Sequence, residues 1–139
     1  MLAEAGVSAG VMAAPMIPAL NDMELEKILE TAAEAGATWA NHTVLRLPHE
    51  IKDLMREWLE AHAPLKANHV LSLVREMRGG KLNDPNFGSR MRGEGAYAEA
   101  LSLRARLAKK RYGLDRELAP LDCSRFKPPP RAGDQLAFL

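Results

Sequence analysis

One polar segment, GGKLNDPNFGSRMRGEG at residues 79–95, contains the side chains best suited to binding chemistry. It has five glycines, and the basic residues Lys81, Arg90 and Arg92 lie around Phe87. The segment is too polar for a core and long for a passive connection, which favours a functional role. Basic side chains and an aromatic ring among flexible glycines suit contact with a phosphate backbone. It contains no phosphate-loop motif.

The charge distribution bears on the same hypothesis. The net charge is only +1, but residues 1–74 carry −5 and residues 75–127 carry +6. An anionic partner on the basic half and a set of solvated helices both explain this split. We expect nucleic-acid contacts, if present, from these side chains: Lys81, Arg90, Arg92, Lys109, Lys110 and Arg111.

Motifs of the common catalytic and metal sites are absent from the sequence. It has no Ser-His-Asp set, no HExxH helix, no paired cysteines and no glycine-rich nucleotide loop. The single cysteine, Cys123, cannot form an internal disulfide or, by itself, a structural metal site. We expect no metal site, no membrane span and a cytoplasmic location, because the apolar start carries Glu4 and lacks a basic region.

A strand, a helix and a second strand are predicted in the first 47 residues. Residues 7–14 are apolar or small throughout, which is typical of a strand covered on both faces. Residues 23–35 show a one-sided helical pattern, and residues 38–47 form the second strand. Asn21 or Asp22 is expected to cap the helix, with Glu24 as the capping-box partner of Asn21. This order makes the strands parallel.

The second strand carries two candidates for ligand contact, His42 and Arg46. If Leu45 and Leu47 pack under helices, His42 and Arg46 point to the concave side of a barrel-like sheet. The ends of parallel strands are where α/β folds bind ligands. The structural alternatives are that His42 is a core histidine with its hydrogen bonds satisfied and that Arg46 pairs with a neighbouring carboxylate.

Three further helices are predicted after the second strand. The whole chain is predicted to be an α/β fold divided into three segments. Residues 1–78 form two βα units with helices from Pro48 to Pro64 and over 65–78, and residues 79–113 form the basic loop and helix. Residues 114–139 form an irregular tail. The apolar stripe of the first of these helices is expected in the core, and it comprises Ile51, Leu54, Met55, Trp58 and Leu59. The helix over 96–112 presents Tyr97 inward and Arg104 on an exposed basic face.

Nearly the whole chain resembles the C-terminal portion of radical S-adenosylmethionine proteins related to spore photoproduct lyase, the DNA repair photolyase-like family. The matching stretches are AEAGVSAGVMAAPMIPALND, VLRLPHEIKDLMREWLEAHAP and LSLVREMRGGKLNDPNFGSRMRGEGAY, and the MRGGKLNDPNFGSRMRGEG block is the most specific. The resemblance implies the last two strands of a partial (βα) barrel, with packed helices and a basic helical extension.

The resemblance also implies a cofactor site at the strand ends. S-adenosylmethionine would lie near these residues: Ala14, Pro15, Ile17, Arg46 and Leu47. The family holds a [4Fe-4S] cluster with a CxxxCxxC loop, and this sequence has only Cys123. We therefore expect this chain to hold neither cofactor alone and to be catalytically silent.

Two functional hypotheses follow from the sequence. In the first, the chain is the C-terminal part of a radical enzyme whose other barrel half supplies the cluster. In the second, it is a non-catalytic module that binds nucleic acid or protein through residues 81–111. Two parallel strands cannot form an independent sheet, so the partner is expected to be a missing N-terminal barrel half or a second copy.

Overall fold

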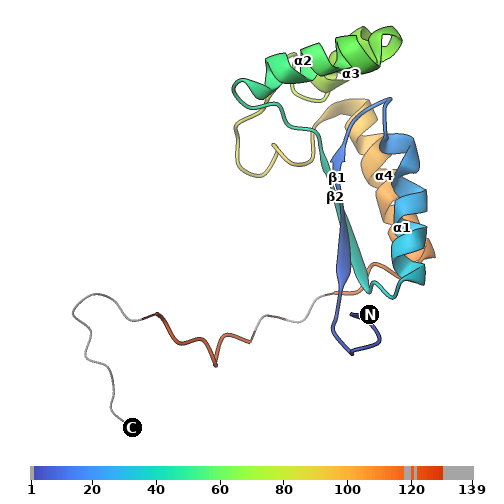
Figure 1. Ribbon diagram of the computed structural model, residues 1–139, viewed down its shortest axis with the longest axis vertical. Helices are drawn as coiled ribbons and strands as arrows, with labels where there is room; N and C mark the ends of the chain where they lie inside the picture. Colours follow the sequence, from blue (N-terminus) through green and yellow to red (C-terminus); the bar gives the residue numbers. More distant parts are fainter. Residues whose placement is uncertain (1, 118–119, 121, 130–139) are drawn as a thin grey trace.

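The computed structural model describes residues 2–117, 120 and 122–129, and this part of the chain is a mixed α/β fold of two parallel strands and four α-helices (Figure 1). The α/β class and the parallel pair are as predicted. Along the chain the elements are β1 (Gly10–Met16), the 3-10 turn η1 (Asp22–Glu24), α1 (Leu25–Glu34), β2 (Trp39–Val44), α2 (Ile51–His62), α3 (Pro64–Glu76) and α4 (Gly95–Arg111).

The strands pair in register from Gly10 opposite Trp39 to Ala13 opposite His42, and the register then shifts before Met16. The first strand begins at Gly10, later than predicted, and Val7 is exposed. Helices α1 and α4 lie on the same side of the strands (Figure 1). We call β1, β2, α1 and α4 the sheet layer.

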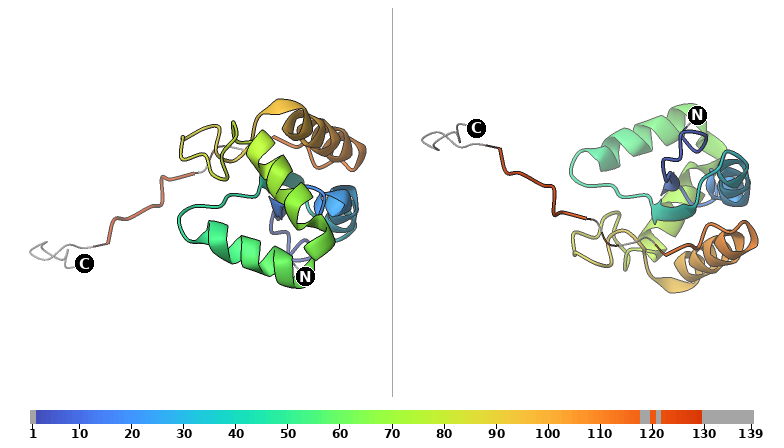
Figure 2. Two further views of the ribbon diagram at one scale, coloured as in Figure 1. Left: turned by 90° about the horizontal axis from the view of Figure 1, so that it is seen from above. Right: turned by 90° about the horizontal axis from the view of Figure 1, so that it is seen from below.

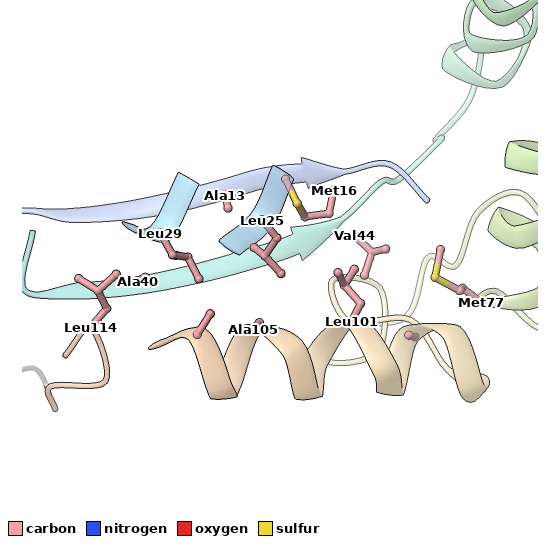
Figure 3. Packing of buried hydrophobic residues seen from close by; sticks show 12 residues of the cluster. Ala13, Met16, Leu25, Leu29, Ala40, Val44, Met77, Leu101, Ala105 and Leu114 are labelled. Carbon is pink, nitrogen blue, oxygen red and sulfur yellow. The ribbon is translucent and has the colours of Figure 1, made fainter. Parts of the chain in front are cut away.

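The core of the sheet layer lies between the strands and these two helices (Figure 3). Apolar residues at helical spacing give α1 one buried face, as the sequence predicted. On α4 the predicted inward position of Tyr97 is confirmed, because its side chain is partly buried against the core. Its larger buried side chains are Met16, Leu25, Leu29, Val44, Met77, Leu101 and Leu114.

The described residues leave the opposite face of the sheet uncovered, which corrects the prediction of a strand buried on both faces. Alternation along the strands assigns six residues to this face, and we call it the open face: Gly10, Met12, Ala14, Trp39, Asn41 and Thr43. Met12 is 50% exposed, and Ala14 and Asn41 are also exposed. The apolar or small residues at 7–14 suggested cover on both faces, but small residues also fit a face that is not covered.

The two outer edges of the sheet differ. On the outer side of β2, the N–H of Ala40 donates to the carbonyl of Leu114 at 3.0 Å, and the N–H of Val44 donates to that of Met91 at 3.1 Å. On the outer side of β1, no strand pairs within the part of the chain that the structure describes. The sheet is thus closed at β2 and open at β1.

Helices α2 and α3 form a second unit, the helical hairpin, beyond the C-terminal ends of the strands (Figures 1 and 2). Its core is separate from that of the sheet layer, and the loop after β1 packs against it through Ile17. Its buried residues are Leu45, Leu47, Leu59, Ala67, Val70, Leu71 and Val74.

The predicted core stripe of α2 is largely wrong. Leu59 is fully buried and Met55 packs beside it, but Ile51, Leu54 and Trp58 are 44%, 58% and 46% exposed. Helix α2 packs mainly against α3, and only part of its apolar stripe is covered.

Two expectations concern parts of the chain beyond these units. No helix among the described residues is long and apolar enough to cross a bilayer. In the predicted irregular tail, residues 122–129 contain no helix or strand and are exposed. Residues 118–119, 121 and 130–139 of that tail lie outside the described residues.

Candidate functional site

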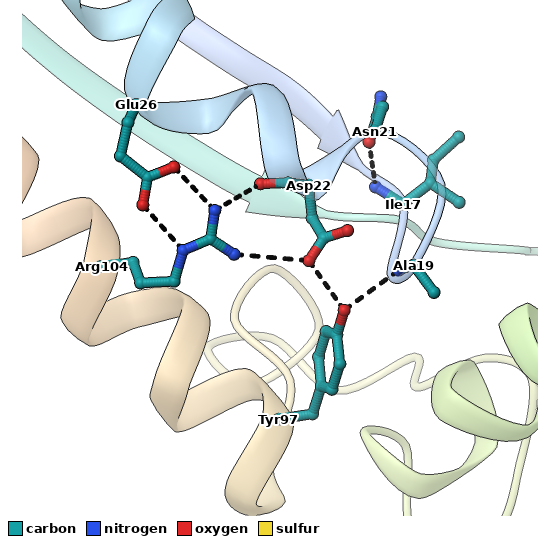
Figure 4. Close-up of polar contacts among 7 residues, drawn as sticks. All are labelled: Ile17, Ala19, Asn21, Asp22, Glu26, Tyr97 and Arg104. Atoms are coloured by element: carbon teal, nitrogen blue, oxygen red, sulfur yellow. Dashed lines mark hydrogen bonds and ion pairs between the residues drawn. The ribbon is translucent and has the colours of Figure 1, made fainter.

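The loop after β1 is held by a side chain that the sequence suggested for another task. The Oδ1 atom of Asn21 accepts the N–H of Ile17 at 2.7 Å (Figure 4), and its Nδ2 atom donates to the carbonyl of Pro15 at 3.1 Å. Asn21 is the N-cap of η1 but makes no side-chain capping bond, and the N-cap of α1 is Glu24. The capping-box prediction is therefore wrong, because Asn21 bonds backward to the loop.

A polar network joins this loop and α1 to α4 (Figure 4). The hydroxyl of Tyr97 donates to the buried carboxylate of Asp22 at 2.7 Å and accepts the N–H of Ala19 at 3.0 Å. Arg104 donates to both carboxylate oxygens of Glu26 at 2.7 Å and to the backbone carbonyl of Asp22 at 2.9 Å. Arg104 was expected on an exposed basic face, and it is instead committed to this network.

The electrostatics of the network follow from these contacts. The hydrogen bonds from Arg104 hold the pKa of the Glu26 carboxyl below its usual value, and the same contact raises the pKa of Arg104. Burial raises the pKa of the Tyr97 hydroxyl, and its bond to Asp22 acts in the same direction. The network is a structural tie that fixes the loop against α4.

The residues predicted to lie near a cofactor divide between two environments. Ala14 and Pro15 are exposed, and Arg46 is half-buried at the end of β2. Ile17 packs against the hairpin core, and the Leu47 side chain is completely buried within it. The resemblance placed all five near a cofactor at the strand ends, and in the structure the side chains of Ile17 and Leu47 belong to the hairpin core.

His42 lies on the helix-covered face of the sheet, because it alternates with the buried residues Ala40 and Val44. Its orientation is thus opposite to the concave-side hypothesis. Leu45 and Leu47 do pack under helices, but under α2 and α3 of the hairpin. Burial lowers the pKa of His42, and the positive charge of Lys109 on α4 adds to this shift. The Nδ1 atom of His42 is buried and has no hydrogen-bond partner among the described residues, so His42 is a partly buried histidine of the core but not a satisfied one.

Sequence reasoning missed Arg78, which follows α3. Its side chain is only 5% exposed. Its Nη2 atom donates to the backbone carbonyl of Leu45 at 2.9 Å and to that of Val44 at 3.5 Å, and its Nη1 atom donates to that of Ser89 at 3.5 Å. Arg78 therefore ties residues 79–95 to the end of β2. An arginine between an apolar helix and two glycines was the only signal for it in the sequence.

The basic side chains predicted to bind nucleic acid fall into separate groups. Phe87 is 91% exposed, the guanidinium of Arg90 lies 5.2 Å from its ring centroid, and both line a cavity of about 600 Å³ with Arg92. Lys81 lines a different cavity beside Arg78. Lys109, Lys110 and Arg111 are in the last turn of α4, which begins near the glycine-rich segment. The structure brings Arg90 and Arg92 together and does not join them to the last three.

The chain's own groups do not fit an iron-sulfur cluster. Within the described residues, no three His, Cys, Asp or Glu side chains gather where they could hold a metal ion. Cys123 is exposed and lies in the tail. Comparisons of the chain with family models, curated proteins and solved structures gave no match.

Proposed function

We propose that this chain is the C-terminal part of a radical S-adenosylmethionine enzyme of the photolyase-like class and contributes the last two strands of its partial barrel. The observation that carries the proposal is the one-sided sheet, with helices on one face and an open face on the other. A barrel strand pair has this arrangement, since helices cover its outside and its inside faces the lumen.

The asymmetry of the edges supports the same assignment. The free edge of β1 would accept the preceding barrel strand, and the covered edge of β2 would end a barrel that does not close. A polypeptide carrying the CxxxCxxC loop would therefore dock along β1 and the open face. A second copy of this chain is the other candidate for the β1 edge. We place the assembly in the cytoplasm.

In this proposal the cluster comes from the other barrel half, because the described residues do not fit it. Arg46 and the backbone around Pro15 would hold S-adenosylmethionine at the strand ends. When bound together, the two cofactors supply radical hydrogen abstraction. The hairpin would exclude water from one side of that site.

Assembly is the direct test. We would co-express the chain with the polypeptide encoded immediately upstream and measure co-purification. Met12→Arg should abolish association because it buries a charge in the lumen, whereas Leu107→Arg, at an exposed position of α4, should not. Absence of an in-frame CxxxCxxC upstream, or equal association of both variants, would contradict the proposal. A dimer of this chain alone that Met12→Arg disrupts would support the second-copy alternative.

A second candidate function is nucleic-acid binding by the basic segment. The observation that favours it is the exposed Phe87 ring with Arg90 stacked on it beside Arg92, since aromatic rings stack on bases and arginines neutralise phosphates. Affinity for single-stranded oligonucleotides should fall as salt rises and fall further in Phe87→Ala, with Phe126→Ala in the tail as control. Affinity that is independent of salt would remove this function.

A further inference from the structure

The outer edge of β2 has a gap at His42. On this side of the strand, the backbone N–H groups of Ala40 and Val44 donate to carbonyls of other segments. Between these two positions, the N–H of His42 donates to the side chain of its own neighbour, Asn41, at 2.9 Å. The edge is therefore tied to the rest of the described chain on both sides of His42 but not at His42 itself.

A cavity of about 600 Å³ adjoins this gap, and its volume is in the range of small-molecule sites. Three separate parts of the chain enclose it: β2 with His42 and both of its neighbours, α4 with Ser102, and the segment 79–95. No carboxylate is among the described residues that line it. In this respect it differs from the cavity beside Arg78, which contains two carboxylates.

The wall formed by β2 and α4 offers hydrogen-bonding groups to a guest. The Nδ1 atom of His42 is buried without a partner among the described residues, so Nε2 is the ring nitrogen that remains for a ligand. Burial and the positive charge of Lys109 lower the pKa of His42, which keeps its ring neutral at about pH 7. Thr43 and Ser102 add hydroxyl groups to the same lining.

The opposite wall combines an aromatic ring with two cations. Phe87 is 91% exposed, so burial within its own chain does not explain the position of the ring. The guanidinium of Arg90 lies 5.2 Å from the ring centroid, and Arg92 lines the same cavity. Because the lining contains no carboxylate, the charge of these two arginines favours an anionic guest.

The loop that carries Phe87 is held by its own polar groups. The carboxylate of Asp84 accepts the N–H of Asn86 at 2.8 Å and the hydroxyl of Ser89 at 2.6 Å. The N–H of Arg90 donates to the carbonyl of Asn86 at 3.2 Å. A loop held in this way loses less conformational entropy on binding, so the exposed ring is preorganised for contact with a ligand.

We propose that this cavity binds a nucleoside 5′-phosphate, free or as one unpaired unit of a single strand, with its base stacked on Phe87 and its phosphate at Arg90 and Arg92. The edge of the base would face His42. A nucleotide combines a flat ring, a hydrogen-bonding edge and an anion, which match the three kinds of group on the walls. Inorganic phosphate would leave the ring and the β2 wall unused, and an apolar ligand would leave the arginines unpaired. The inference rests on the nucleic-acid function proposed above and deepens it by naming the residue that contacts the base.

Calorimetric titration of the full chain tests the site with four probes at one ionic strength: AMP, adenosine, inorganic phosphate and a single-stranded octamer of deoxyadenylate. AMP should bind about tenfold more tightly than adenosine or phosphate, because it uses both walls. AMP affinity no greater than that of phosphate would overturn the proposal. Binding of the octamer that is tighter than that of AMP identifies the strand as the source. Binding of AMP without the octamer identifies the free nucleotide and removes the nucleic-acid function alone.

Variants separate the base contact from the phosphate contact. His42→Phe keeps the size of the side chain and removes its nitrogens, so AMP affinity should fall about tenfold, while His69→Phe on the exposed side of α3 should bind as the wild type does. Unchanged AMP affinity in His42→Phe would overturn the cavity site, even where Phe87→Ala still weakens octamer binding and the nucleic-acid function stands.

Arg92→Gln changes an exposed side chain, so it tests the site without altering the core. It should weaken the binding of AMP and of inorganic phosphate by the same factor, because both lose one charged donor. Arg75→Gln removes the same charge at an exposed position of α3 and is the control. Equal AMP affinity of Arg92→Gln and Arg75→Gln would overturn the phosphate contact.

Discussion

The sheet layer and the helical hairpin are stabilised in different ways. In the sheet layer, polar side chains far apart in the sequence meet, as Arg104 does with Glu26. In the hairpin, the one ion pair within a helix is the exposed Arg56–Asp53 contact, and Leu59 and its apolar neighbours form the core. The comparison indicates that polar contacts fix how the elements of the sheet layer are placed, while the hairpin is stabilised mainly by apolar burial.

Truncation of core side chains should change the free energy of unfolding most and tests whether the two cores are independent. Leu29→Ala in the sheet layer and Leu59→Ala in the hairpin remove side chains with 1% and 0% exposure, so each should lower the free energy of unfolding by about 2–5 kcal/mol. Because the cores are separate, Leu59→Ala should speed amide hydrogen exchange mainly in α2 and α3.

The fully exposed Leu65 provides the control for both truncations. Leu65→Ala should leave the free energy of unfolding within about 0.5 kcal/mol of the wild type. If Leu29→Ala and Leu59→Ala speed exchange equally in both regions, the chain unfolds as one unit and the division into two cores carries no energetic meaning.

Tyr97→Phe tests the polar tie with an intermediate effect. The change leaves the N–H of Ala19 and the Asp22 carboxylate without their shared partner, which should cost about 1–3 kcal/mol in urea unfolding. Ser102→Ala on the exposed side of the same helix should have no measurable effect. A neutral Tyr97→Phe would mean that water replaces the hydroxyl and that the loop is held by other contacts.

The smallest effect should appear in the pH dependence of stability. The folded pKa of Glu26 lies below its ordinary value of 4.5, so its pair with Arg104 stabilises the fold above that pH and loses its contribution as pH falls through the lowered folded pKa. Both side chains are more than a third exposed, which limits the contribution to under about 1 kcal/mol.

Unfolding curves of Glu26→Gln and wild type, measured from neutral to acid pH, check this. The difference should be full above pH 4.5 and should disappear as the pH falls through the lowered folded pKa of Glu26. Glu60→Gln, at an exposed position of α2, should run parallel to the wild type at all pH values. A difference that grows on acidification would contradict the assignment.

The sequence predicted the elements well because periodicity and breakers act locally. Gly36 and Pro64 ended helices near the expected positions, and the βαβ order fixed the parallel pair. The face of the sheet on which each side chain lies was predicted poorly. The face that His42 occupies depends on which side of the sheet the helices cover, and the sequence of the strand does not show this. Arg78 could not be found because its three partners are backbone carbonyls, which no side-chain pattern marks.

The close packing of Trp39 on Gly10 has a practical consequence. The indole ring occupies the space that a Cβ atom of Gly10 would fill, so it lies on the open face of the sheet. The other tryptophan, Trp58, is on the hairpin and stacks near His62 at 5.2 Å. The two emit from different regions, so in Trp58→Phe a blue shift of the remaining fluorescence would report directly on a polypeptide covering the open face.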